Sequence, residues 1–124
     1  GGRELANSLV LYRWKLAADT GATGAGISRV VIPITRVRGA KRWKGLHPSD
    51  LTIDPASGQY VLVASRERAL IVLPPDGGAG QARPLPGGRR HEHAEGVAIA
   101  RDGVLIVSDE SGYRSAAITL YRWP

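Results

Sequence analysis

The chain has 124 residues, 43% of them hydrophobic, and a formal net charge of +6. This length suits one domain with a modest core, and the hydrophobic content argues against a disordered chain. Cysteine is absent, which excludes disulfides and thiolate metal sites, and no apolar run approaches the roughly 18 residues of a membrane span. The chain starts with two glycines and contains no methionine, so we expect it to be a piece of a longer protein.

The positive charge raises the question of nucleic-acid binding, because basic patches attract phosphates. The basic residues are dispersed except for one cluster around Trp43, formed by Arg36, Arg38, Lys41, Arg42 and Lys44. No helix-turn-helix, zinc-finger or RNA-recognition pattern accompanies this cluster. We therefore predict a solvated loop here and do not expect a nucleic-acid partner.

The first part of the chain predicts two strands. Residues 1–7 form a polar lead-in, and residues 8–16 alternate and are rich in β-formers, which is typical of a strand. After a loop rich in Gly, Ala and Thr, residues 30–35 are mostly β-branched. Pro33 cannot donate a ladder hydrogen bond, so this second segment is expected at a sheet edge or at a bulge.

The remainder of the chain also predicts strands. Short apolar or alternating runs separated by turn residues occur at 51–53, 60–65, 69–73, 81–85, 97–99, 104–107 and 117–123. The run at 60–65 is apolar throughout, which indicates burial on both faces. Asp102 and Gly103 separate two apolar runs, and this pair is a strong hairpin signal. No segment combines helical periodicity with capping residues, so the sequence predicts an all-β fold.

Two internal repeats suggest the architecture. Leu11–Trp14 (LYRW) recurs as Leu120–Trp123, which makes Trp14 and Trp123 candidate packing residues, and His47–Ile53 aligns with His93–Ile99. Repeats of roughly 40 to 50 residues built from short strands are typical of β-propeller blades. The sequence therefore predicts about two to two and a half four-stranded antiparallel blades of a partial propeller.

The blades divide the chain into four parts. After the lead-in, residues 8–39 are expected to form the outer strands of a partial blade, residues 40–88 a complete blade, and residues 89–124 a last blade without its outer strand. Propellers need typically 4 to 8 blades to close. The expected partners are therefore the remaining blades of a parent chain or copies of this chain, since open ends would expose apolar faces and strand edges.

Three groups of residues resemble a known family. They are Asn7–Tyr12; Gly45–Leu51 with Asp54 and Pro55; and Glu95–Val97 with Asp102, Gly103 and Ser108–Glu110. On these motifs the chain resembles the C-terminal part of six-bladed propellers of the phytase-like esterase and SdiA-regulated group. The resemblance implies a bacterial, extracytoplasmic protein that is associated with calcium and acts as an ester or phosphoester hydrolase.

The innermost strands of a propeller line its axial channel, so residues at their starts converge from several blades. Ser49 and Asp50 hold this position in one blade, and Glu95 holds it in the next. Because calcium needs several oxygen ligands, Glu95 is the first candidate ligand and Asp50 the second, followed by Asp109 and Glu110. Alternatively, Glu95 accepts hydrogen bonds from backbone amides and Asp109 caps a turn.

The histidines suggest either an imidazole site or a structural role. His47 and His93 are equivalent in the repeat, so they are expected to point similarly in adjacent blades and to line the channel with Ser49. A repeated hydrogen bond between blades is favoured over a metal site or an acid/base pair that also includes His91. Ser49 lies close to His47 in sequence, but a G-x-S-x-G elbow is absent, which does not favour a serine hydrolase.

Three functions are consistent with these patterns. The first is a calcium-associated hydrolase with its site in the axial channel of the parent propeller. The second is a non-enzymatic propeller that binds a small molecule or a protein. The third is a fragment that closes a ring from copies of itself. In each case we expect the chain alone to be inactive as an enzyme, because channel residues from other blades are missing.

Overall fold

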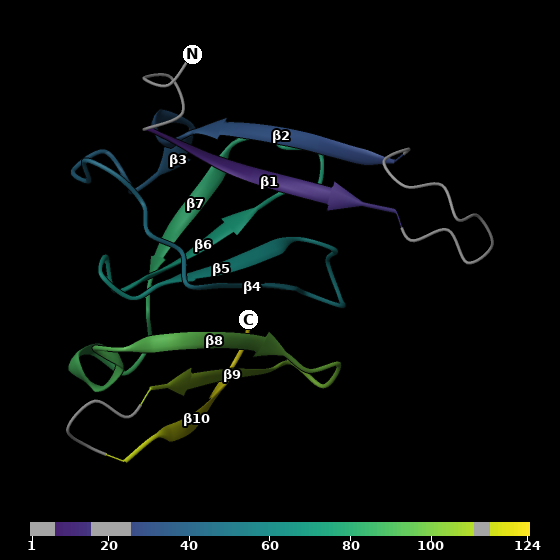
Figure 1. The fold of residues 1–124 in the computed structure, drawn as a ribbon. Helices are drawn as coiled ribbons and strands as arrows, with labels where there is room; N and C mark the ends of the chain where they lie inside the picture. The colour runs from purple at the N-terminus through teal and green to yellow at the C-terminus, as the bar shows by residue number, and fades with distance from the viewer. Residues whose placement is uncertain (1–6, 16–25, 111–114) are drawn as a thin grey trace.

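The computed structural model describes residues 7–15, 26–110 and 115–124, which form three β-sheets stacked face to face (Figure 1). The predicted all-β fold is confirmed. Two short 3-10 helices, η1 (Ile34–Arg36) and η2 (Gly88–His91), interrupt the strands and were not expected from the sequence. No helix in these three segments is long and apolar enough to cross a membrane.

The first sheet is an antiparallel pair of strands, β1 (Ser8–Trp14) and β2 (Ile27–Pro33). Pro33 is the last residue of β2, so its missing N–H does not interrupt the hydrogen bonds within the strand. The side chains of Leu9 and Ile32 are paired across this sheet and are almost completely buried. This face of the pair therefore packs on the rest of the protein.

The middle sheet is an antiparallel meander of four strands, β4 (Asp50–Ile53), β5 (Tyr60–Ala64), β6 (Ala69–Leu73) and β7 (Gly80–Pro84). A fifth, two-residue strand, β3 (Val37–Arg38), pairs parallel with Gly80 and Gln81 at the start of β7. We did not predict β3 from the sequence, since two residues are too few to show alternation. Pro84 is the last residue of β7, so it still fits the ladder.

The third sheet has the order β10-β9-β8, with β8 (Ala94–Ile99), β9 (Val104–Asp109) and β10 (Ala117–Arg122). The predicted turn at Asp102 and Gly103 joins β8 to β9, and Gly103 has the positive φ of +79° that this turn requires. A bulge interrupts the β8–β9 register between Ala94 and Gly96. Glu95 is the extra residue at this bulge.

The two hydrophobic clusters lie between the sheets, so the middle sheet is covered on both faces. Val61, Val63 and Leu70 of the middle sheet pack against the third sheet, whereas Leu62 and Ile71 pack against the first. All of β6 and nearly all of β5 are buried, as the unbroken apolar sequence of β5 predicted. The stack thus depends on strands that are apolar on both faces.

The LYRW repeat has the same orientation in both copies. Tyr121 of β10 and Trp123, just beyond the end of this strand, pack toward the middle sheet, whereas Leu120 is exposed on the outer face. In β1, Leu11 packs toward the middle sheet, while Tyr12 and Trp14 are exposed by 71% and 61%. The Tyr and Trp of both copies therefore lie on the same face of their sheet. In the third sheet this face contacts the middle sheet, whereas in the first sheet it is the outer, exposed face. Packing was predicted for both tryptophans and is confirmed for Trp123 only.

The second repeat also has equivalent positions with different burial. Val97 and Ile99 of β8 are 7% and 8% exposed against the middle sheet. Their repeat partners in β4, Leu51 and Ile53, are 39% and 53% exposed. The difference arises because the described first sheet has only two strands, which do not extend over β4.

The basic cluster lies around η1, β3 and the following turn. Trp43 is half-buried and packs against the hydrophobic core between the first and middle sheets. One side of the Trp43 ring is therefore engaged by the core and does not stand free among the basic side chains. Lys41, Arg42 and Lys44 are exposed, as predicted for a solvated loop.

Candidate functional site

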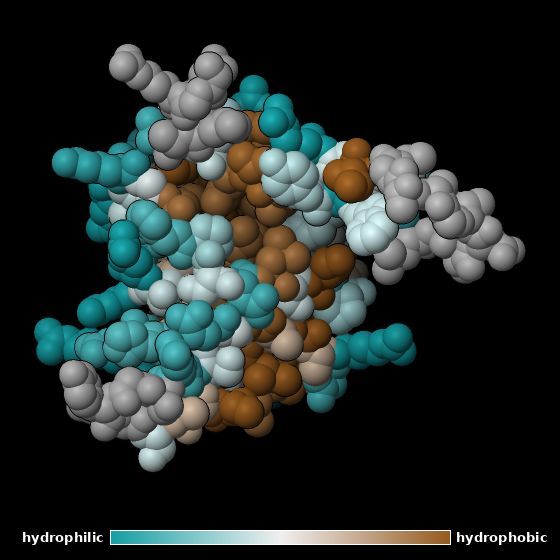
Figure 2. All heavy atoms as spheres, in the orientation of Figure 1, coloured by the Kyte–Doolittle hydropathy of each residue, from teal (hydrophilic) through white to brown (hydrophobic). Residues whose placement is uncertain are grey.

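The candidate site residues gather where β4 and β8 begin and β5 and β9 end, an edge we call the polar rim. It comprises His47, Ser49, Asp50, Ser65, Arg66, Glu67, His91, His93, Glu95, Asp109 and Glu110. The rim lies on the left of Figure 1, and hydrophilic side chains cover that side of the molecule in Figure 2. Antiparallel pairing places the start of one strand beside the end of its neighbour, which explains why segments distant in sequence meet here.

Asp50 links the starts of β4 and β8. The Val97 N–H donates a hydrogen bond of 2.8 Å to Asp50 Oδ2, which connects β4 of the middle sheet to β8 of the third. The carboxylate also lies close to Gly96, the residue that follows the bulge. One oxygen of this predicted calcium ligand is thus already used to hold two sheets together.

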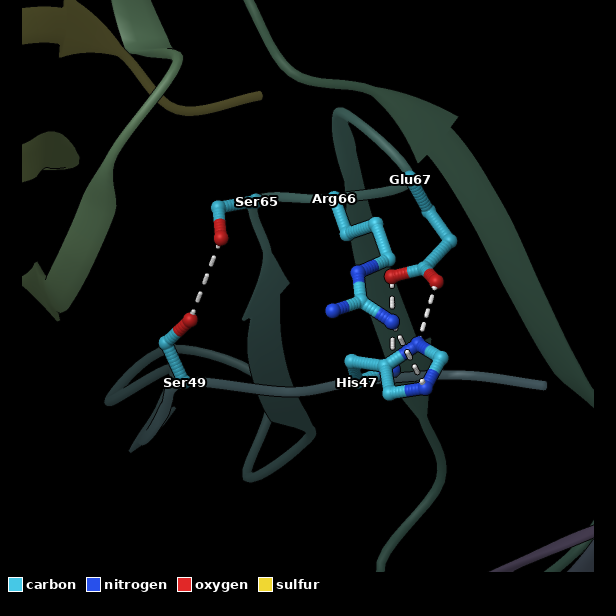
Figure 3. Close-up of polar contacts among 5 residues, drawn as sticks. All are labelled: His47, Ser49, Ser65, Arg66 and Glu67. Carbon is cyan, nitrogen blue, oxygen red and sulfur yellow. Dashed lines mark hydrogen bonds and ion pairs between the residues drawn. The ribbon is translucent and has the colours of Figure 1, made fainter.

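His47 is held by Glu67 from the turn between β5 and β6 (Figure 3). Glu67 Oε1 lies 2.7 Å from His47 Nδ1, and Glu67 Oε2 accepts a hydrogen bond of 3.3 Å from the His47 backbone N–H. The Glu67 side chain is only 5% exposed, whereas that of His47 is 54% exposed. The nearly buried carboxylate therefore fixes the orientation of a ring that still faces solvent.

The other ring nitrogen of His47 faces Arg66, whose Nη1 lies 3.4 Å from His47 Nε2. A guanidinium can only donate, so this contact fits a neutral ring with its proton on Nδ1, directed at Glu67, and a lone pair on Nε2. The Arg66 donor therefore lies at the Nε2 lone pair, the position from which a general base would accept a proton.

Ser49 does not join this group. Its hydroxyl lies 3.4 Å from the Ser65 hydroxyl, and Figure 3 shows the two serines together, away from the His47 ring. A serine nucleophile needs a hydrogen bond to its base. Ser49, His47 and Glu67 therefore supply the residue types of a hydrolytic triad without its geometry.

A second imidazole, His91 at the end of η2, is completely buried. Its Nδ1 lies 2.6 Å from Asp109 Oδ2 of β9, and its Nε2 lies 2.6 Å from the Tyr121 hydroxyl of β10. With Nδ1–H donating to the carboxylate, Nε2 accepts the phenolic proton. This Asp109–His91–Tyr121 chain thus ties η2 to β9 and β10, two neighbouring strands of the third sheet.

Asp109 retains one unused oxygen. Among the described residues, Asp109 Oδ1 is a buried side-chain atom without a hydrogen-bond partner. An unpaired buried oxygen is costly and suggests a missing ligand, ion or water. Asp109 was predicted to hold a metal or to cap a turn. Its Oδ2 orients a buried histidine, which was not predicted, and the metal role of the carboxylate stays a prediction.

The remaining predicted residues are exposed. Glu95, Glu110 and His93 make no side-chain hydrogen bond or ion pair with the part of the chain that the structure describes. Glu110 and His93 are joined through the backbone, since the Glu110 N–H donates to the His93 carbonyl at 3.0 Å. The alternative role for Glu95, accepting backbone hydrogen bonds, is not seen here. The His93 side chain also lacks the contact that its repeat partner His47 makes.

The predicted ligands are not gathered into one compact group in the described residues. Within residues 7–15, 26–110 and 115–124, no group of three or more His, Asp or Glu side chains is placed to hold a metal ion. Calcium takes 6–8 oxygen ligands. Asp50 and Asp109 each offer one oxygen not engaged in the hydrogen bonds described above, and the exposed carboxylates of Glu95 and Glu110 are also open, so the calcium site stays a prediction.

Two important rim residues, Glu67 and the buried His91, were not predicted as site residues. Glu67 follows His47 by 20 positions and belongs to a charged turn. Nothing in the sequence of this turn indicates that the Glu67 side chain points toward His47. His91 was considered only as one of three histidines. Two sequence features could have indicated a buried partner for His91. They are the polar Asp109 after the apolar run 104–107 and Tyr121 of the LYRW repeat.

Comparison with known protein families, with curated proteins and with solved structures found no match to this chain.

Proposed function

We propose that this chain is a run of consecutive β-propeller blades whose polar rim binds a small polar ligand without catalysing a reaction. The observation that supports this most is the hydrogen bond between Asp50 Oδ2 and the Val97 N–H, which sets the starts of β4 and β8 side by side. Adjacent inner strands that begin at one rim are what a propeller channel requires. The meander order of the middle sheet and the face-to-face stacking agree with this arrangement.

A binding role is favoured because the groups for catalysis are engaged elsewhere. His47 Nε2 faces the Arg66 guanidinium, and Ser49 pairs with Ser65. By contrast, the exposed carboxylates Glu95 and Glu110 are open hydrogen-bond acceptors. A ligand that presents hydroxyl or ammonium donors fits such acceptors.

Titration of the chain with spermidine, as a cationic probe, and with glucose, as a neutral polyol probe, tests this function by NMR. We expect shifts in the amides of the rim, and Glu95→Gln should weaken spermidine binding by about tenfold, the value of one charge-assisted hydrogen bond. Asp102→Asn is the matched control, because Asp102 is exposed at the opposite end of the third sheet. Equal losses in both variants, or turnover of ester substrates by the chain, would contradict the proposal.

A second candidate is the calcium-associated hydrolase that the family resemblance implies, active when the propeller is complete. The unpaired Asp109 Oδ1 favours it, since a cation would satisfy a buried oxygen that no described residue satisfies. In this candidate Asp50 and Glu95 belong to the same site, with further oxygen donors from other blades.

Calorimetry with calcium chloride distinguishes the two candidates. If the second is correct, a protein that contains all blades binds calcium, and Asp109→Asn together with Glu95→Gln abolishes binding and ester turnover. If such a protein neither binds calcium nor hydrolyses esters or phosphoesters, the hydrolase is excluded and the binding role stands.

A further inference from the structure

An apolar groove lies between the first sheet and β4. Its volume is about 240 Å³, and it is lined mainly by Leu11, Val30, Leu51, Ile53, Tyr60 and Pro75. Leu11, Val30 and Tyr60 also pack against the buried core between the first and middle sheets. The groove is therefore a direct continuation of an established interface, which stops where the first sheet ends. In Figure 2 hydrophobic atoms remain visible on this face between the first and middle sheets.

The interface between the middle and third sheets shows what covers the equivalent positions. There, Val97 and Ile99, the repeat partners of Leu51 and Ile53, lie in one cluster with Val61 and Val63. Val61 and Val63 belong to β5, which forms a hairpin with β4. Inner strands of the preceding sheet thus bury these positions to 7% and 8% exposure. No hairpin within residues 7–15, 26–110 and 115–124 covers the groove in this way.

The first sheet offers an edge where such a hairpin can pair. By the LYRW repeat, β1 is equivalent to β10, and β10 pairs along its length with β9. In the described residues β1 pairs only with β2, so the edge that β9 occupies on β10 is open on β1. An exposed strand edge beside an apolar groove is the usual setting for recognition by strand addition.

We propose that the open edge of β1 and the apolar groove together form a docking site for a β-hairpin supplied by a partner polypeptide. This inference rests on the blade arrangement proposed above. One strand of the hairpin pairs antiparallel with β1. Alternate apolar side chains of the hairpin then cover Leu51, Ile53 and Tyr60, as Val61 and Val63 cover β8. Edge pairing supplies affinity, and the alternation of apolar residues supplies selectivity.

A peptide with the sequence of residues 49–65, the β4–β5 hairpin, flanked by lysines and cyclised, serves as the probe. Calorimetry and amide shifts of the full chain should show binding at β1 and β4. Leu51→Asp with Ile53→Asp in the chain should weaken binding at least about tenfold, because the apolar side chains of the peptide would then be buried against carboxylates and not against Leu51 and Ile53. Both residues are partly exposed already, so this variant is expected to fold.

Matched controls distinguish binding in the groove from nonspecific hydrophobic binding. Ile118→Asp changes a 73% exposed residue on the outer face of the third sheet and should leave binding unchanged. In the peptide, Val61→Asp with Val63→Asp should abolish binding, whereas Leu62→Asp, on the opposite face, should preserve it. Equal loss with Ile118→Asp, or shifts confined to the third sheet, would overturn the docking site.

Two further outcomes are decisive. Slow hydrogen exchange of the Val97 amide reports that the middle and third sheets are stacked. If this amide exchanges slowly and the peptide does not bind, only the docking site is overturned. If this amide exchanges fast, the blade arrangement is overturned as well. A concentration-dependent dimer in sedimentation that Leu51→Asp with Ile53→Asp dissociates would show that a second copy fills the groove, and a separate partner would then be excluded.

Discussion

Trp123, the next-to-last residue, donates a hydrogen bond of 3.2 Å from its indole N–H to Oδ2 of Asp54. The two residues are 69 positions apart and directly follow β10 and β4, so this bond connects the end of the third sheet's last strand to the turn after β4 of the middle sheet. Asp54 is 6% exposed and also accepts hydrogen bonds from the Ser57 hydroxyl and the Ala56 amide. Arg83 of β7 stacks over the Trp123 ring at 5.5 Å, which further fixes the indole.

Stability should fall at acid pH partly through Asp54. The Ser57 hydroxyl, followed by the Ala56 amide, holds the pKa of Asp54 below its ordinary value of 3.8, because hydrogen bonds to the ionised carboxylate favour it. A lowered folded-state pKa stabilises the protein above the unfolded-state value, and this contribution is lost as the pH falls through the folded-state pKa. Urea unfolding from pH 7 to pH 2.5 should show this loss below about pH 4.

Asp54→Asn is the variant that isolates this effect. It should destabilise the protein by about 1–3 kcal/mol at pH 7, because a neutral amide replaces a carboxylate that accepts several hydrogen bonds. Its unfolding free energy should also fall less steeply with acid than that of the wild type. Parallel pH curves for the two proteins would contradict the role of Asp54.

Tyr121→Phe should destabilise the third sheet by about 1–3 kcal/mol, since it leaves His91 Nε2 buried without a partner. Tyr12→Phe is the matched control from the same LYRW repeat. Tyr12 is 71% exposed, so its variant should change the unfolding free energy by less than about 0.5 kcal/mol. Chemical denaturation of both variants measures the difference, and equal effects would refute the buried Asp109–His91–Tyr121 chain.

The strands could be predicted because their signals are local. β5 is apolar on both faces, and the pair Asp102–Gly103 between two apolar runs predicts a hairpin from a few consecutive residues. Contacts between sheets could not be predicted in this way. The Asp50–Val97 and Trp123–Asp54 bonds each join residues more than 40 positions apart, and no pattern in the sequence distinguishes these carboxylates from solvated ones.

The repeats nevertheless contained more information about the site than composition did. The equivalence of His47 and His93 led us to expect similar surroundings for the two rings, but in the described residues the Glu67 contact of His47 has no counterpart at His93. A repeat transfers backbone position, whereas a side-chain contact also requires the partner residue to be repeated. The orientation of Glu95 likewise depends on a bulge that alternation alone does not reveal.

Gly87→Ala should be more damaging than an ordinary substitution at a left-handed glycine. Gly87 has φ of +85°, and a Cβ here would collide with the Tyr121 hydroxyl and crowd the His91 ring. Gly58→Ala is the control, because Gly58 has φ of +73° and open space around the added carbon. We expect Gly58→Ala to cost about 1 kcal/mol for the backbone alone and Gly87→Ala to cost about 1–3 kcal/mol more.

The thermal midpoints of the two glycine variants provide the measurement. A similar loss in both would mean that only the backbone conformation matters and that Tyr121 can move away from Gly87 without cost. A larger loss for Gly87→Ala that disappears when Tyr121→Phe is already present would locate the collision at the hydroxyl.

Variants of Asp50 separate its structural role from its proposed ligand role. Asp50→Ala removes the acceptor for the Val97 N–H and should lower the unfolding free energy by about 1–2 kcal/mol. Asp50→Asn keeps a carbonyl oxygen in place, so it should preserve most of the stability while removing the charge that a cation needs. Hydrogen exchange at the Val97 amide should accordingly be fast in Asp50→Ala and slow in Asp50→Asn. If Asp50→Ala leaves that amide protected, the carboxylate does not hold the two sheets together, and the strongest support for adjacent inner strands is lost.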